Sequence, residues 1–174
     1  MLNVTLRSRR LIVLAAASAL AASPALAGNW VRGGAFDPVR GVVSTFLRFL
    51  AEDGEGQMTI RCSTADGLTM DVGVAGNAAL PQGAVIGGET IVDLAFPGAA
   101  APTSIQVLGT LLIRQDGAVL VSLSRDGAAA VAVALAAGAD QAVATIGGVT
   151  RPVPLETLSP LLPGFAAACA GWPG

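Results

Sequence analysis

The stretch from Met58 to Val74 reads MTIRCSTADGLTMDVGV, and its pattern decides the class of fold that we predict. On both sides of Asp66-Gly67, apolar or cysteine side chains occupy every second position. Alternation with a period of two is typical of a half-buried strand, and Asp-Gly between two such stretches is typical of a hairpin turn. The stretch therefore predicts an antiparallel hairpin.

The register of this hairpin follows from the rule that directly opposed residues share a face of the sheet. A two-residue loop would set Cys62 against Asp71 and mix the faces. A three-residue loop, Ala65-Asp66-Gly67, sets Cys62 against Met70 and Arg61 against Asp71, and it gives its glycine the left-handed position that such loops require. We therefore predict the three-residue loop.

Two further Asp-Gly pairs extend the pattern into a meander of three strands. A loop at 115–117 pairs Leu111 with Val121, and a loop at 125–127 pairs Leu123 with Ala129. The predicted strands are 104–114, 118–124 and 128–135. The third segment is rich in alanine, so a short helix is the alternative there.

Other segments complete the expected domain. Residues 90–96 are predicted as a strand followed by a loop at 97–102, and residues 41–50 as a strand or an amphipathic helix. Near the end, Ser159 and Pro160 are predicted as the N-cap and first position of a helix that stops at Gly171. Helical spacing turns Cys169 of this segment toward the core.

Residues 28–174 are therefore predicted to form a single domain that is mainly β: an antiparallel β-sandwich or barrel-like domain with a short C-terminal helix. Aromatic residues are few, at 4% of the chain. Trp30 and Trp172 lie near the two ends of this domain, and we expect them to pack together.

Residues 1–27 are predicted to be a secretory signal peptide. Three arginines precede a twelve-residue apolar run from Leu11 to Ala22, which is too short to span a bilayer. Ala25-Leu26-Ala27 then forms a cleavage site, with cleavage expected between Ala27 and Gly28. The arginine pair leaves a twin-arginine route as the alternative to the general secretory route. The sequence therefore predicts a periplasmic or secreted protein.

Cys62 and Cys169 are the only cysteines. Export would place them in an oxidising compartment, where such a pair forms a structural disulfide. The alternatives are two buried thiols or a redox pair, although the Cys-x-x-Cys spacing of a redox motif is absent. We predict a disulfide that ties the first part of the domain to its last turn.

The composition excludes several kinds of catalysis. The chain has no histidine, lysine or tyrosine, and all ten basic residues are arginine. It therefore offers no imidazole base, no Schiff-base lysine and no P-loop phosphate ligand. We expect no enzyme activity, no cofactor and no metal, and we assign no catalytic, cofactor-binding or metal-ligating residue. The residual enzymatic hypothesis is a carboxylate-based hydrolase or a calcium site at Glu52, Asp53 and Glu55, for which a solvated turn is the favoured interpretation.

The charge restricts the class of partner. Three of the ten arginines precede residue 28, which leaves seven against twelve carboxylates and a net charge of −5. This acidic balance argues against nucleic acid and against anionic lipid as partners. We expect no stable membrane insertion once the signal peptide is removed.

The layout also resembles known proteins. Three features carry the resemblance: Trp30 near the mature start, Arg61-Cys62 at the end of an early strand, and a late helix, Phe165–Cys169, followed by Trp172. This layout resembles small bacterial periplasmic proteins of the invasion-associated locus B type. The layout is similar as well to the small periplasmic proteins associated with type VI secretion, which end in a helix with cysteine and tryptophan. Locus B proteins commonly carry more cysteines than the two here. The resemblance implies a non-enzymatic, β-sandwich-like envelope protein and carries over no functional residue.

Two functions are therefore expected. The first is an exported, non-enzymatic envelope or secreted protein that acts through contact with an envelope or secreted protein partner, using sheet edges or exposed apolar loops such as 95–101. The alternative is a periplasmic carrier of a small apolar ligand, which the 53% hydrophobic composition favours.

Overall fold

A computed structural model describes residues 28–52, 56–74, 84–98, 103–113, 119–169 and 171–172. The predicted signal peptide, Asp53 and Glu55 lie outside these residues. The described elements, in chain order, are β1 (Gly28–Asp37), β2 (Val42–Ala51), β3 (Gly56–Ser63), β4 (Gly67–Val74), β5 (Glu89–Phe96), β6 (Thr103–Ile113), β7 (Val119–Leu123), α1 (Arg125–Ala136), β8 (Gln141–Ile146), β9 (Val149–Pro154) and α2 (Leu162–Ala168).

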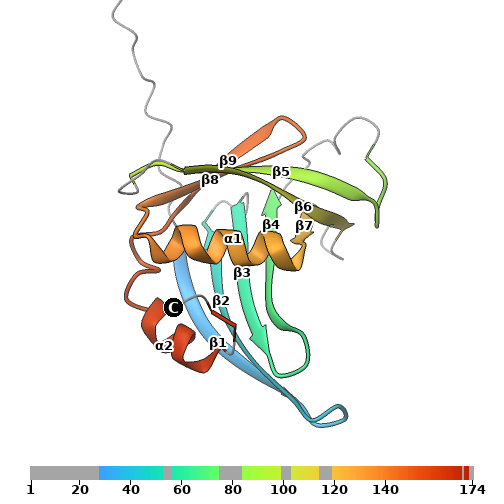
Figure 1. The fold of residues 1–174 in the computed structure, drawn as a ribbon, viewed down its shortest axis with the longest axis vertical. Coiled ribbons are helices and arrows are strands. Elements are labelled where there is room, and N and C mark those ends of the chain that lie inside the picture. The colour runs from blue at the N-terminus through green and yellow to red at the C-terminus, as the bar shows by residue number, and fades with distance from the viewer. Residues whose placement is uncertain are drawn as a thin grey trace, which may run out of the picture.

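The nine described strands form one antiparallel sheet in the order β1-β2-β3-β4-β7-β6-β5-β8-β9. The sheet is strongly bent and does not close into a barrel. In Figure 1, β5, β6, β8 and β9 cross over one end of β2–β4, and α1 lies across the opening between these two parts. The mainly β, antiparallel fold with a short C-terminal helix confirms the predicted fold class.

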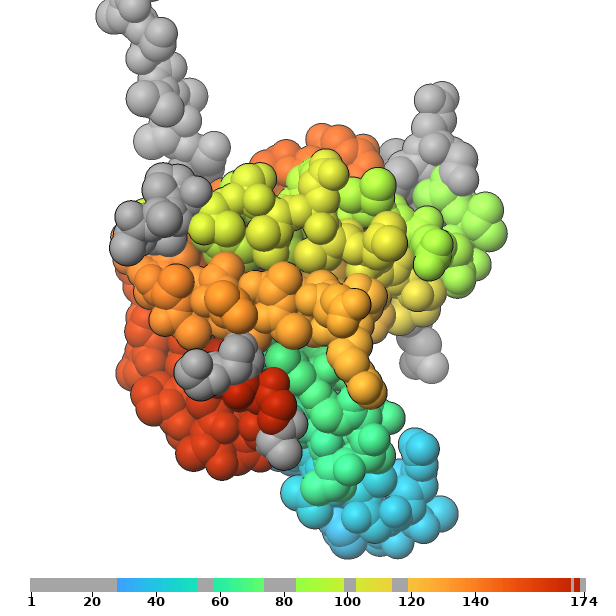
Figure 2. All heavy atoms as spheres, viewed as in Figure 1, coloured from blue at the N-terminus to red at the C-terminus, as the bar shows by residue number. Residues whose placement is uncertain are grey.

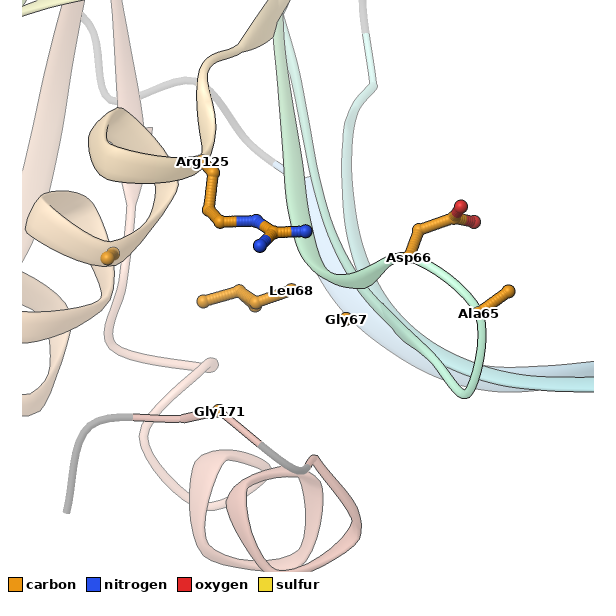
Figure 3. Close-up of a pocket in the computed structure, with 7 residues that line it drawn as sticks. Ala65, Asp66, Gly67, Leu68, Arg125 and Gly171 are labelled. Carbon is orange, nitrogen blue, oxygen red and sulfur yellow. The ribbon is translucent and has the colours of Figure 1, made fainter.

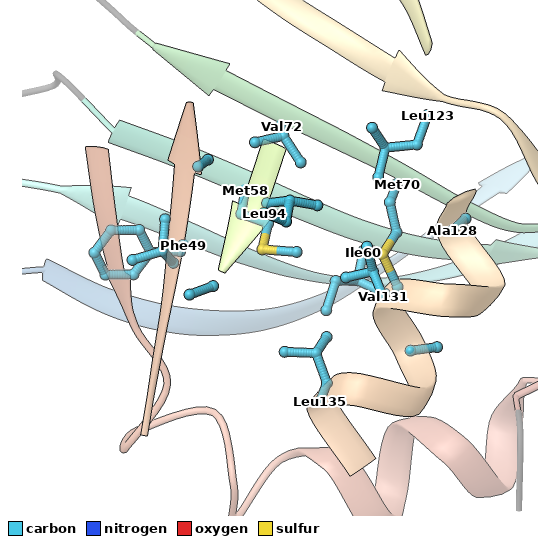
Figure 4. Close-up of a cluster of buried hydrophobic side chains, with 14 of the residues drawn as sticks. Phe49, Met58, Ile60, Met70, Val72, Leu94, Leu123, Ala128, Val131 and Leu135 are labelled. Atoms are coloured by element: carbon cyan, nitrogen blue, oxygen red, sulfur yellow. The ribbon is translucent and has the colours of Figure 1, made fainter. Parts of the chain in front are cut away.

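The core fills the space inside the bend. Alternate residues of most strands point inward, and α1 adds a face of alanine, valine and leucine side chains. Figure 4 shows this cluster, whose labelled members are Phe49, Met58, Ile60, Met70, Val72, Leu94, Leu123, Ala128, Val131 and Leu135. Because aliphatic side chains from both parts of the sheet interdigitate here, the two parts are held together by a single core.

The two edges of the sheet approach each other without pairing as strands. The indole Nε1 of Trp30 in β1 donates a hydrogen bond of 2.8 Å to the carbonyl oxygen of Pro154 in β9. The Trp30 ring packs on Phe49, whereas Trp172 packs edge-on against Phe165 of α2. The prediction that the two tryptophans pack together was therefore wrong, because each ring has its own phenylalanine partner.

The β3–β4 hairpin forms as predicted, but its register is shifted by two residues. Cys62 lies opposite Leu68 and Ser63 opposite Gly67, so Arg61 faces Thr69 and not Asp71. The backbone N–H of Asp66 donates to the Ser63 hydroxyl at 2.8 Å and closes the turn one step earlier than expected. A shift of two keeps every side chain on its predicted face.

The second predicted hairpin has the expected register, with Leu111 opposite Val121 and Ile113 opposite Val119. Its turn lies outside the described residues. The segments 90–96 and 41–50 are both strands, as part of β5 and of β2.

The third predicted strand is instead the helix α1. The Ser124 hydroxyl accepts a hydrogen bond from the N–H of Gly127 and caps the helix, and Asp126 lies in its first turn. The Asp-Gly pair that resembled a turn is thus the start of a helix, where a carboxylate is favourable. Ala128, Val131 and Leu135 then face the core at helical spacing.

The C-terminal helix α2 begins later than predicted. Its N-cap is Leu161 with no side-chain cap, and Pro163 stands in its first turn. The assignment of Ser159 and Pro160 to the helix start was wrong, because residues 155–162 first make a series of tight turns. Cys169 at its end is buried, as expected.

Candidate functional site

The two cysteines are joined as predicted. Cys62 in β3 and Cys169 at the end of α2 form a disulfide, with their Cα atoms 5.5 Å apart. The bond fixes α2 against the inner face of the β1–β4 part of the sheet. It is a structural link between distant segments, and both residues are buried.

The acidic cluster is not assembled within the described residues. Glu52 is exposed just after β2, while Asp53 and Glu55 lie outside the described part of the chain. Among the residues that the structure describes, no group of three or more carboxylate or cysteine side chains is close enough to hold a metal ion. Gly28, the residue after the predicted cleavage site, is the first residue of β1.

A shallow hollow of about 280 Å³ lies between the β3–β4 turn, the start of α1 and Gly171. Figure 3 shows Arg125 reaching toward this hollow while the Asp66 carboxylate points away from it. Asp66 is engaged by the Ser63 hydroxyl, which donates to it at 3.1 Å. The described lining therefore offers one guanidinium and no paired acid and base.

An apolar hollow of about 320 Å³ lies between the two helices. Its lining consists of Leu135, Ala136, Gly138, Ser159, Leu162, Pro163, Ala166 and Trp172. Its size is at the lower end of the range for small-molecule sites, and its one side-chain hydroxyl comes from Ser159. This hollow is one part of the described structure that suits a small apolar ligand.

The most prominent surface feature is the β1–β2 arm, residues 28–51. The ladder between β2 and β3 begins at Ser44 and Ser63, and Val43 forms two further hydrogen bonds with Thr64; the rest of the tip of the arm, residues 36–43, extends past the neighbouring strand. Figures 1 and 2 show this tip projecting beyond the β3–β4 hairpin, away from the helices. The tip is therefore open to a partner from several sides.

The tip carries apolar side chains where a solvated turn would carry polar ones. Phe36 is 63% exposed, Val39 93% and Val43 54%, and Phe36 lies directly opposite Val43. Phe36 and Val43 lie on the same face as the buried Trp30 and Phe49 further along the strands. Between the core and the tip this face carries Arg32, Gly34 and Thr45, so Phe36 and Val43 form an apolar patch that is separate from the core.

The turn at the tip has a defined shape. The Asp37 carboxylate accepts hydrogen bonds from the N–H groups of Val39 and Arg40, at 2.9 and 3.2 Å. Gly41 has a φ of +65°, which a residue with a side chain adopts only with strain. Because hydrogen bonds within the turn already fix its backbone, binding of a partner at Val39 would lose little conformational entropy.

Strand β1 is one edge of the sheet. Within the described residues it pairs only with β2, along ten residues. The opposite edge, β9, contains Pro152 and Pro154, which lack the N–H that an added strand needs. β1 contains no proline, so its outward N–H and C=O groups can pair with another extended chain.

The outer face of the arm and of β3 holds an aromatic ring with two arginines as neighbours. Phe46 lies opposite Gly33 on β1 and opposite Arg61 on β3. The guanidinium carbon of Arg48 lies 5.4 Å from the centre of the Phe46 ring, in a cation–π arrangement. The arm and β3 together carry four of the seven arginines that follow residue 27: Arg32, Arg40, Arg48 and Arg61.

Sequence reasoning missed this site because it predicted no strand over residues 28–37. Alternation is weak there, since glycines stand at 28, 33 and 34. The turn residues Asp37, Pro38 and Gly41 before the strand at 42–51 were the available signal for a hairpin. The loop at 95–101, predicted as a contact surface, is described only in part, with Pro97 and Gly98 exposed.

None of the helices that the structure describes has both the length and the apolar character needed to cross a membrane. Comparison of the chain with protein-family models, with curated proteins and with solved structures finds no match in any of the three.

Proposed function

We propose that this chain is an exported, non-enzymatic envelope or secreted protein that acts by contact with another protein through the β1–β2 arm. Export is supported by the signal-like pattern of residues 1–27 and by the disulfide between Cys62 and Cys169, a bond typical of oxidising compartments. The resemblance to small periplasmic proteins of the locus B and type VI secretion-associated types points to the same compartment.

One observation carries the proposed contact. The arm combines a strand edge that no other described strand pairs with and a protruding tip that exposes Phe36, Val39 and Val43. Exposed strand edges and contiguous apolar patches tend to associate with other chains, and proteins usually protect them when no partner exists. The protection present on β9, with its two prolines, is absent from β1.

The test is site-specific photo-crosslinking in cells that export the protein. A photoreactive amino acid at position 39 should give a discrete crosslinked protein, and one at position 133, an exposed valine on α1, should give none. Phe36→Ser with Val39→Ser should abolish the capture of that protein in pull-downs. Equal crosslinking from positions 39 and 133, or none from either, would contradict the proposal.

Export has its own measurement. The intact mass of periplasmic protein should correspond to a chain that starts at Gly28. Alkylation should label two thiols only after reduction. A retained N-terminus, or thiols that react without reductant, would contradict export or the disulfide.

A second candidate function, carriage of a small apolar ligand, is supported by the apolar hollow between α1 and α2. Native mass spectrometry of the purified protein should then show a bound apolar compound. Ala166→Phe would fill the hollow and release the compound, while Val133→Phe on the exposed side of α1 would not. A protein that purifies free of ligand would remove this candidate.

A further inference from the structure

The outer face of the arm holds a guanidinium with unused hydrogen-bonding capacity. The Arg48 Nε is buried and has no acceptor within the described part of the chain. Arg61 is exposed on β3, opposite Phe46, and neither arginine forms an ion pair with a carboxylate of the described residues. A buried N–H without an acceptor is uncommon in proteins, so the positive charge of Arg48 is poorly compensated within the described residues.

The site opens toward the edge of the sheet. Gly33 has no side chain, and the Phe46 ring lies over it: a Cβ at position 33 would be only 2.3 Å from the ring. A strand added to β1 would place one of its side chains opposite Gly33 on this same outer face. That side chain would meet the Phe46 ring, and the next side chain on this face, opposite Val31, would lie in the row of Arg48.

We infer that the partner adds an extended segment as a strand to β1 and places a glutamate or aspartate carboxylate against Arg48, with Arg61 flanking the same anion. This inference rests on the proposed function and names the chemistry of the partner. On the inner face, residues of the same segment would alternate with the acidic ones and cover Phe36. The partner segment therefore alternates acidic and apolar side chains.

The surroundings favour a single carboxylate over a polyanion. Asp71 lies on the same face, in the row that runs from Arg48 through Thr59. The chain after residue 27 carries a net charge of −5, which repels a nucleic acid or a strongly anionic bilayer. A lipid surface also offers no backbone partner for the N–H and C=O groups of the β1 edge.

The experiment uses the oxidised chain that starts at Gly28 and two capped nine-residue peptides. One alternates valine with glutamate, and the other has glutamine in place of each glutamate. Titrations are followed by the NMR signals of backbone amides and arginine Nε–H groups. The glutamate peptide should shift the β1 amides and the Arg48 Nε–H signal, and it should bind about ten-fold more tightly than the glutamine peptide.

Three variants locate the effect. Arg48→Gln should make the two peptides bind equally, and Arg61→Gln should reduce the difference between them. Arg125→Gln, which changes an arginine at the start of α1, should leave the preference at its wild-type value. Circular dichroism and thermal unfolding of each variant establish that the fold is retained.

The outcomes distinguish the carboxylate site at Arg48 from the addition of a strand to β1. If both peptides bind equally and shift the same β1 amides, the carboxylate site is wrong and the arm is still a strand-binding edge. If neither peptide shifts β1, the strand addition is wrong, whatever the crosslinking from position 39 shows. If phosphatidylglycerol vesicles bind the protein and the glutamate peptide does not, the arm contacts lipid and the inference is overturned.

Discussion

The indole of Trp30 in β1 donates a hydrogen bond to the carbonyl of Pro154 in β9. This bond links the two edge strands of the bent sheet. The two edge strands are not paired in a ladder, so this 2.8 Å bond links them, while packing on Phe49 of β2 holds the Trp30 ring in place. The base of the arm is thereby anchored to the opposite edge of the sheet.

Trp30→Phe tests this link. Phenylalanine keeps a ring against Phe49 but leaves the Pro154 carbonyl without its donor, so the free energy of unfolding should fall by about 1–3 kcal/mol. Urea unfolding measures the change, with Trp172 as the remaining tryptophan fluorophore. A change smaller than about 0.5 kcal/mol, the size typical of neutral surface substitutions, would show that packing alone closes the bend.

Removal of the disulfide should destabilise the protein strongly. The bond closes a span of 107 residues, so Cys62→Ala with Cys169→Ala should lower the free energy of unfolding by about 2–5 kcal/mol. Urea unfolding with and without reductant checks this prediction. Reductant should destabilise the wild type and leave the double variant unchanged; equal stability of wild type and variant would contradict a structural role.

The two serines that precede the helices should behave differently. Ser124→Ala removes the cap that accepts from Gly127 and should cost about 1 kcal/mol. Ser159→Ala changes an exposed residue outside α2 and should alter the free energy of unfolding by less than about 0.5 kcal/mol. Thermal unfolding of the two variants side by side measures both; the opposite ranking would mean that α1 is not capped at Ser124.

Two glycines provide a test of close packing. A Cβ at Gly109 in β6 would lie 2.4 Å from a Val121 methyl group and 2.7 Å from the Ser122 carbonyl oxygen, which cannot move freely. Gly109→Ala should therefore destabilise by about 1–3 kcal/mol. A Cβ at Gly34 meets only the Ser44 carbonyl oxygen, at 3.3 Å, so Gly34→Ala is the matched control with a small effect. Chemical denaturation of both variants distinguishes them.

Most of the local structure could be predicted from the sequence because alternation reports which side chains face the core. Cys62 and Cys169 were both predicted to face inward, and they are bonded. The β6–β7 register was right, with Leu111 opposite Val121. The β3–β4 register was two residues off because alternation cannot distinguish shifts that preserve the faces.

The candidate site could not be predicted in the same way. Phe46, Arg48 and Arg61 come from two strands, and their proximity to Gly33 depends on the pairing of β1, which has little alternation of its own. The alanine-rich segment 125–136 presented a similar ambiguity. Its Asp-Gly suits either a hairpin turn or a helix start, and packing against the bent sheet decides for the helix.

By itself, the sequence determined the class of fold, the faces of the central strands and the pair of cysteines that closes the domain, because each of these depends on neighbours in the chain or on a unique pair of residues. Only the tertiary structure decided the bend that brings Trp30 to Pro154, the helix α1, and the arm that leaves Phe36 and Val39 exposed. These features depend on contacts between segments far apart in the chain, and the free energy of burying both parts of the sheet in one core selects them over the local alternatives.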